Sequence, residues 1–203
     1  MAKINLGLDV LGKREDGYHE VRMIMQTIRM YDILDIRKTR RPGIVLTTNL
    51  PFIPTDQRNL VYKAAQMLME EFDVEEGLSI KLRKFIPVAA GMAGGSSDAA
   101  AAFVGVNRMF HLGLTEEQLM ERAVKVGADV PYCIMRGTAL AEGIGEKLTR
   151  LPEVPKCYVL IGKPGINVST KTAYENLNLE GIGKHPDIDG LIGAIRNNDL
   201  YAM

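Results

Sequence analysis

The stretch that most constrains the fold runs from residue 86 to residue 103 and reads I-P-V-A-A-G-M-A-G-G-S-S-D-A-A-A-A-F. The alternating, basic segment 78–86 predicts a strand that stops at Pro87, and the alanine run 99–102 predicts a helix that begins near Ser96. Three glycines lie between them: Gly91, Gly94 and Gly95. Glycines let a backbone approach a ligand closely, and the first turn of a helix presents N–H groups that have no intrahelical acceptor. The stretch therefore predicts a strand, loop and helix that hold a phosphate.

A plainer alternative stays open for the same residues. Gly-Gly-Ser is also typical of a tight turn before a helix that is capped by Ser96, Ser97 or Asp98. The better-known nucleotide loops are not matched, because no Lys follows Gly95 as in G-x-x-x-x-G-K-[ST], and no G-x-G-x-x-G follows a strand. Neither a Walker-type nor a Rossmann site is indicated.

The charge balance excludes strongly electrostatic partners. Lys and Arg together number 25, as do Asp and Glu, so no overall field attracts nucleic acid or an anionic membrane. No apolar run approaches the ~20 residues of a membrane span, and the N-terminus lacks the hydrophobic core of a signal peptide. We therefore expect a cytoplasmic protein that binds a small metabolite.

The cysteines and histidines do not form a metal pattern. Cys133 and Cys157 lie in apolar, strand-like contexts, so we expect buried and reduced thiols. The three histidines are too scattered to suggest a metal cluster.

The N-terminal part of the chain alternates apolar and polar residues, as half-buried strands do. Lys3 and Asn5 lie on the polar face of the first strand, where solvent exposure is the simplest interpretation. The turn-rich loop 12–17 precedes Tyr18 and His19, which could stack on and hydrogen-bond a ring, or be a packed tyrosine and a surface histidine. Further strands are expected at 20–30, 33–38 and 44–48, the last two joined by a basic turn (37–41) that we interpret as an exposed hairpin tip.

Helices are indicated by their caps and spacing. Asn59 precedes an amphipathic helix, and Thr115 with Gln118 forms a capping box for a helix that ends at Gly127. Asp129 follows that helix and precedes the apolar run 132–135, which we interpret as a strand. Asp129 fits a turn former, and it also fits the base that activates a hydroxyl near a phosphate. Short strands are expected at 137–141 and 148–151.

A composition shift at 151–155 predicts a boundary between a domain of residues 1–150 and a second domain of residues 151–203. In the second domain we expect a buried strand at 157–162, a short helix capped by Ser169 or Thr170, and a helix at 188–196.

Several short motifs, in this order and spacing, resemble those of the GHMP kinases. They are A-K-I-N-L at 2–6, D-G-Y-H at 16–19, N-L at 59–60, P-x-x-x-G-x-x-G-G-S-S-D-A-A at 87–100, G-A-D-V-P at 127–131 and K-P-G at 163–165. The loop departs mildly from the family, which often has Gly-Leu-Gly-Gly-Gly where this chain has Gly-Met-Ala-Gly-Gly at 91–95. The implied fold class is α+β: a two-layer ribosomal-protein-S5-like ATP-binding domain followed by an incomplete ferredoxin-like GHMP C-terminal domain.

The resemblance also implies a reaction and its residues. Asp129 would take the proton from the substrate hydroxyl with Lys3 beside it, and Mg²⁺ would bridge the oxygens of ATP. Tyr18, His19 and Tyr174 would recognise a cytidine, with Asn5 and Thr170 as polar contacts. The ATP phosphates would be wrapped by Pro87, Val88, Ala89, Ala90, Gly91, Met92, Ala93, Gly94, Gly95, Ser96 and Ser97.

The expected substrate is a cytidyl-diphospho sugar alcohol of isoprenoid synthesis, and the expected protein is a monomer or weak homodimer. Rival interpretations are a mevalonate- or homoserine-type kinase of the same family, and an RNA-binding module, against which the balanced charge argues. A third is a kinase lacking the extreme N-terminus and most of the C-terminal domain. Its activity would be at least about 10²-fold below that of a longer version.

Overall fold

The computed structural model describes residues 1–165, 170–179, 181 and 183–203. By its internal contacts the chain divides into two compact units. The first contains Met1–Ala2, Arg29–Val88 and Ala93–Met135, and the second contains Lys3–Ile28, Ala89–Met92 and Arg136–Met203. This division concerns packing alone, and the domain boundary near residue 150 stays a prediction.

The first unit is built on a three-stranded sheet of β3 (Ile33–Thr39), β5 (Gly77–Arg83) and β4 (Ile44–Thr48), in that order. β5 pairs antiparallel with β3 and parallel with β4. The three predicted strands are present, although β5 ends at Arg83 and not at Ile86 as predicted. The predicted hairpin between β3 and β4 is wrong, because β5 lies between them. Gly77 permits this insertion: a Cβ there would lie 1.9 Å from the carbonyl oxygen of Arg41 in the turn between β3 and β4.

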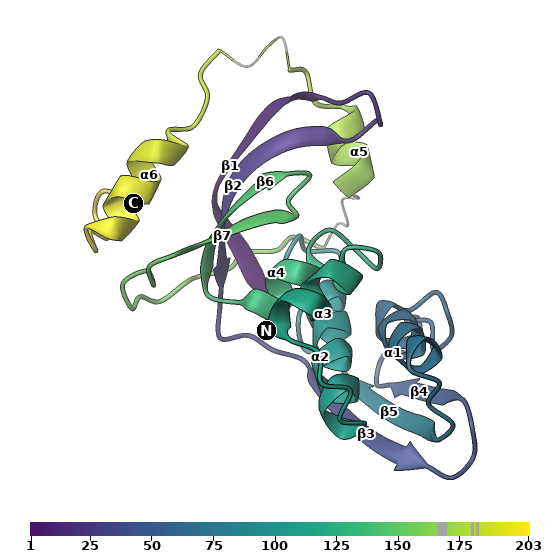
Figure 1. The fold of residues 1–203 in the computed structure, drawn as a ribbon. Coiled ribbons are helices and arrows are strands. Elements are labelled where there is room, and N and C mark those ends of the chain that lie inside the picture. Colours follow the sequence, from purple (N-terminus) through teal and green to yellow (C-terminus); the bar gives the residue numbers. More distant parts are fainter. Residues whose placement is uncertain (166–169, 180, 182) are drawn as a thin grey trace. The chain divides into compact units, whose positions relative to one another are not determined.

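Four helices complete the first unit: α1 (Leu60–Glu71), α2 (Gly94–Met109), α3 (Glu116–Ala123) and α4 (Val130–Met135). α1 and α2 pack against each other, and they also contact β4 and β3, respectively (Figure 1). Asn59 Oδ1 accepts from the N–H of Val61 at 2.9 Å, and the Thr115–Gln118 capping box is present, as predicted. α3 ends at Ala123, so the predicted end at Gly127 was too late.

The predicted strand at 132–135 is wrong, because these residues lie in α4. All six residues of α4 are buried. A short, uniformly apolar run carries no periodicity that separates a buried helix from a buried strand.

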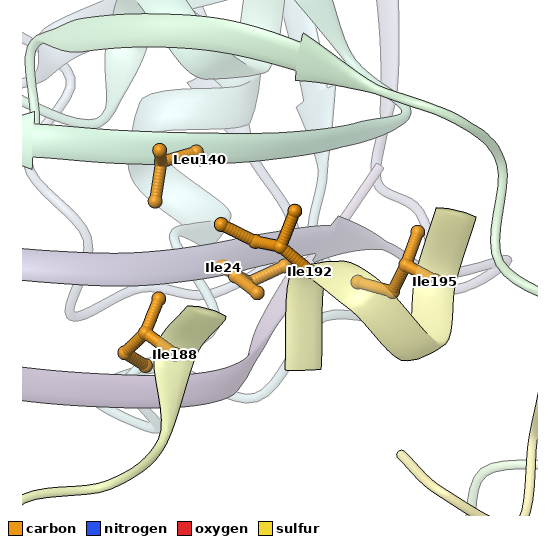
Figure 2. Close-up of a cluster of buried hydrophobic side chains, with 5 residues drawn as sticks. All are labelled: Ile24, Leu140, Ile188, Ile192 and Ile195. Carbon is orange, nitrogen blue, oxygen red and sulfur yellow. The ribbon is translucent and has the colours of Figure 1, made fainter. Parts of the chain in front are cut away.

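The second unit contains an antiparallel sheet in the order β1 (Lys3–Lys13), β2 (His19–Thr27), β6 (Thr138–Gly143) and β7 (Lys147–Leu151). Two helices follow, α5 (Thr170–Glu175) and α6 (Ile188–Arg196). Figure 2 shows how α6 directs its isoleucines toward the sheet. The cluster that they complete is formed by Ile24, Leu140, Ile188, Ile192 and Ile195. Burying such side chains stabilises a fold by about 1.5–3 kcal/mol each.

One predicted element of the second unit is wrong. Residues 157–162 form no strand, Cys157 is exposed, and the side chain of Tyr158 is fully exposed. β7, at the edge of the sheet, pairs with β6 alone, so this apolar run has no strand partner among the described residues. Cys133, by contrast, is buried as expected. No helix in the described part of the chain is both long and apolar enough to cross a bilayer.

Candidate active site

The glycine-rich loop between β5 and α2 has an alternating backbone. Ala89, Gly91 and Ala93 have φ values of 54°, 69° and 51°, whereas Ala90 and Met92 keep negative φ. Alternation between the two signs of φ turns successive N–H groups toward one concave side, a geometry that binds anions. Glycine adopts positive φ readily, but an alanine there carries some strain, which is typical of ligand sites.

α2 begins two residues earlier than predicted, at Gly94 rather than Ser96. Its N-cap is Ala93 in the left-handed conformation, with no side-chain cap, so the prediction that Ser96, Ser97 or Asp98 caps the helix is wrong. The Ser97 hydroxyl instead donates to the carbonyl of Gly94 at 3.1 Å. The first-turn N–H groups, including that of Ser96, have no intrahelical acceptor and lie directly after the alternating segment.

A buried charge cluster lies at the base of this loop, and sequence reasoning missed it. Lys84 Nζ is 2.7 Å from Asp98 Oδ2 and also contacts Asp32 Oδ2. The three side chains are almost fully buried. Burial raises the pKa of Asp98 to about 7; Lys84 opposes this rise, and the neighbouring Asp32 adds to it. Lys84 and Asp98 lie on either side of the predicted loop, but nothing in the sequence pattern pairs them with each other or with Asp32.

Lys3 is buried, with 6% of its surface exposed, so the simplest interpretation of solvent exposure is wrong for this residue. Its ammonium donates to Asn5 Oδ1 at 3.0 Å, and its backbone N–H donates to the carbonyl of Met92 at 3.1 Å. The start of β1 is therefore tied to a residue of the glycine-rich loop.

Asp129 lies in the other unit, immediately before α4. Its backbone carbonyl accepts from the N–H of Cys133 at 3.1 Å, and its side chain is half-buried. The local geometry fits both sequence interpretations, the turn former and the base.

The loop between β1 and β2 is held by Arg14, which bonds Asp16 and Glu20. The hydrogen bond from Arg14 lowers the pKa of Asp16. Asp16 Oδ1 in turn accepts from the N–H of Tyr18 at 3.1 Å, and Gly17 supplies a positive φ of 85°. This network leaves Tyr18 58% exposed at a fixed position.

Two of the predicted base-recognition residues meet in the structure. The rings of His19 and Tyr174 stack, with centroids 5.0 Å apart and an interplanar angle of 28°. Tyr174 lies in α5, so the stack joins β2 to a segment distant in sequence. Thr170 is the first residue of α5, but its side chain, like Ser169, lies outside the described residues.

Comparison with known proteins assigns a family. Residues 59–137 match the model of the GHMP kinases N terminal domain. The chain is 57% identical over 202 residues to the 4-diphosphocytidyl-2-C-methyl-D-erythritol kinase of Lachnoclostridium phytofermentans, covering 100% of this chain and 69% of that protein. It is 56% identical over 199 residues to the kinase of the same name from Lachnospira eligens, covering 98% and 69%.

Solved structures give the same answer for the fold. A crystal structure of 4-(cytidine 5'-diphospho)-2C-methyl-D-erythritol kinase superposes with a TM-score of 0.79 at 30% identity, covering 98% of this chain and 70% of that one. Homoserine kinase from Cytophaga hutchinsonii superposes with a TM-score of 0.64 at 17% identity, covering 98% and 68%, which shows a shared fold alone. The predicted α+β fold class is confirmed.

Proposed function

Because this chain belongs to the GHMP kinases, we propose that it transfers the γ-phosphoryl group of ATP to the 2-hydroxyl of 4-diphosphocytidyl-2-C-methyl-D-erythritol, a step toward isoprenoid precursors. The observation that carries this proposal is the 57% identity, along the whole chain, to a kinase named for that substrate. The homoserine kinase shares the fold at only 17% identity, so it gives no comparable support for a homoserine-type substrate.

We assign the ATP phosphates to the loop from Pro87 to Ser97. The alternating φ values at 89–93 and the first turn of α2 support this assignment, because both present N–H donors to an anion. No atom lies within 4 Å of a Cβ built on Gly91, so the space beside its backbone is open to a phosphate.

Asp129 is the proposed general base and Lys3 the proposed electrostatic partner of the reaction. The substrate oxygen attacks the γ-phosphorus, its proton passes to the Asp129 carboxylate, and the bond from the γ-phosphorus to the β,γ-bridging oxygen breaks to release ADP. The Lys3 ammonium would stabilise negative charge on the transferring group. Its hydrogen bond to Asn5 supports this role by holding the ammonium in one position.

The aromatic residues are the proposed cytidine site. Tyr18 offers an exposed ring on a braced loop, and the His19–Tyr174 stack adds two more planar groups in the same unit. Stacking on such rings is how proteins hold a base. Asn5 and Thr170 stay proposed polar contacts. Mevalonate and homoserine contain no nucleobase, so a kinase for either acceptor would have no use for these stacking rings.

Mg²⁺ is proposed to arrive with ATP. No three His, Cys, Asp or Glu side chains among the described residues form a group that could hold a metal ion. Such an ion would neutralise charge on the phosphates of the bound nucleotide. We further propose a cytoplasmic location, where ATP is abundant, and a monomer or weak homodimer.

The test is ADP release from the purified protein with three acceptors in parallel: the cytidyl erythritol, mevalonate and homoserine. We expect turnover with the first alone, and competition by CMP against that acceptor and not against ATP. Preferred turnover of mevalonate or homoserine, or no competition by CMP, would contradict the assignment.

A further inference from the structure

The buried charge cluster joins the two chain segments that flank the proposed ATP loop. Lys84 directly follows β5 and leads into the loop, whereas Asp98 lies in the first turns of α2, just after it. Lys84 Nζ is 2.7 Å from Asp98 Oδ2, so one ion pair spans the base of the loop. Asp32, just before β3, binds the same ammonium from a third element.

The segment that enters the loop is fixed along its backbone as well. Asp32 Oδ1 accepts from the N–H groups of Phe85 and Ile86, the latter at 2.9 Å. Asn49 Oδ1 accepts from the N–H of Lys84 at 2.8 Å, and Asn49 Nδ2 donates to the carbonyl of Lys84 at 3.1 Å. Every polar group of this network therefore contributes to holding residues 84–86.

The sequence at the start of α2 is fitted to this ammonium. A Cβ added to Gly94 would lie 3.1 Å from Lys84 Nζ and 3.1 Å from Ile86 Cγ2, which is closer than ordinary contact. A Cβ on the next residue, Gly95, would meet only Leu60 Cδ1 at 3.7 Å, an ordinary contact. Gly94 thus lets the first turn of α2 approach Lys84 closely.

Stability alone does not account for such a cluster. Burying ions costs several kcal/mol each, and apolar side chains of similar volume often stabilise a core equally well. Here two carboxylates also share one ammonium, an arrangement that stores unfavourable charge. What the ion pairs add over apolar packing is directional geometry, which a phosphate site needs because a displacement of ~1 Å can cost about 10²-fold in rate.

We infer that Lys84, together with Asp32 and Asp98, is a positioning group that fixes the two ends of the phosphate loop and so sets the geometry in which ATP is bound. The inference rests on the proposed role of residues 87–97 in binding ATP. Lys84 touches neither substrate in this role, because its ammonium is committed to the two buried carboxylates.

The test compares two variants with a matched control. Lys84→Met combined with Asp98→Asn removes the ion pair across the loop but keeps the cluster's net formal charge of one negative unit, with Asp32 still bonded to backbone N–H groups. Lys81→Met makes the same Lys-to-Met exchange at an exposed position of β5, the strand that Lys84 directly follows. We expect the double variant to lose about 10²-fold in kcat/KM for ATP while the acceptor KM stays within about threefold, and Lys81→Met to match the wild type.

Asp98→Asn alone keeps the side-chain volume at position 98 and a hydrogen-bond acceptor for Lys84. This single variant tests the inference if the double variant does not fold. Its KM for ATP should rise several-fold with an unchanged acceptor KM. A folded double variant, or the single variant, with wild-type kinetics for ATP would overturn the inference and leave the proposed function standing. A wild-type protein that neither binds nor consumes ATP would overturn both.

Discussion

Replacing Asp98 by asparagine should change how the free energy of unfolding depends on pH. The pKa of Asp98 rises from 3.8 to about 7, first because burial disfavours the carboxylate; Lys84 lowers it, and Asp32 raises it further. At pH values between these two pKa values, Asp98 is protonated in the folded protein but ionised in the unfolded chain. The stability from this group is therefore fully present below about pH 4 and is lost as the pH rises through about 7.

The size of the effect follows from the shift. About three pKa units at 1.36 kcal/mol each correspond to about 4 kcal/mol, of which about 2.5 kcal/mol falls between pH 5 and pH 8. The asparagine side chain of the variant does not titrate, so the stability of the wild type relative to Asp98→Asn should fall by that amount over this range. Urea unfolding followed by far-UV circular dichroism at half-unit pH steps measures the difference.

The matched control is Asp56→Asn. Asp56 is exposed, and its hydrogen bond from Arg58 lowers its pKa to about 2, so its contribution is lost only as the pH falls below about 4. The difference curve for this control should be flat between pH 5 and pH 8. A curve for Asp98→Asn that is equally flat would refute the reasoning that burial raises the pKa of the Asp98 carboxyl group.

Three further substitutions test the site and the core. Asp129→Asn should lower turnover by about 10²–10⁴-fold with little change in ATP affinity, and near-normal kcat would demote Asp129 to a turn residue. Tyr174→Ala should weaken CMP binding in calorimetry by about 1–3 kcal/mol, whereas equal affinity would remove the ring from the base site. Ile188→Ala should cost about 2–5 kcal/mol in urea unfolding, because Ile188 is 3% exposed in the cluster beneath α6; a loss below 1 kcal/mol would contradict that packing.

Much of the fold was predictable because its signals are local. Asn59 and Thr115 are caps whose hydrogen bonds involve residues two or three positions away, and the helix at 188–196 carries a clear periodic pattern. The order of β3, β5 and β4 was not predictable in the same way, since it depends on pairing across the intervening helix α1. The start of α2 was predicted too late, because Ala93 is the N-cap through its left-handed backbone conformation and no capping side chain marks that position in the sequence.

The site residues likewise divide into those with a local sequence signal and those that meet only through contacts between distant segments. Tyr18, His19 and the glycine-rich loop stand in recognisable motifs, whereas the His19–Tyr174 stack is a contact between distant segments. The cluster of Lys84, Asp32 and Asp98 could not be predicted from the sequence, because the three residues are separated along the chain and meet only in the folded protein. Asp98 was interpreted as a cap for a good local reason, but a buried ammonium binds its carboxylate instead.

The central place of β5 in its sheet has a consequence during protein synthesis. β3 and β4 leave the ribosome first, yet neither pairs with the other, and both wait for a strand that emerges only after α1. At about 5–20 residues per second the nascent chain therefore presents two unpaired strand edges for seconds. Such edges are templates for pairing with another chain, so slow translation of residues 49–76 should favour aggregation of nascent chains, and faster translation there should favour folding.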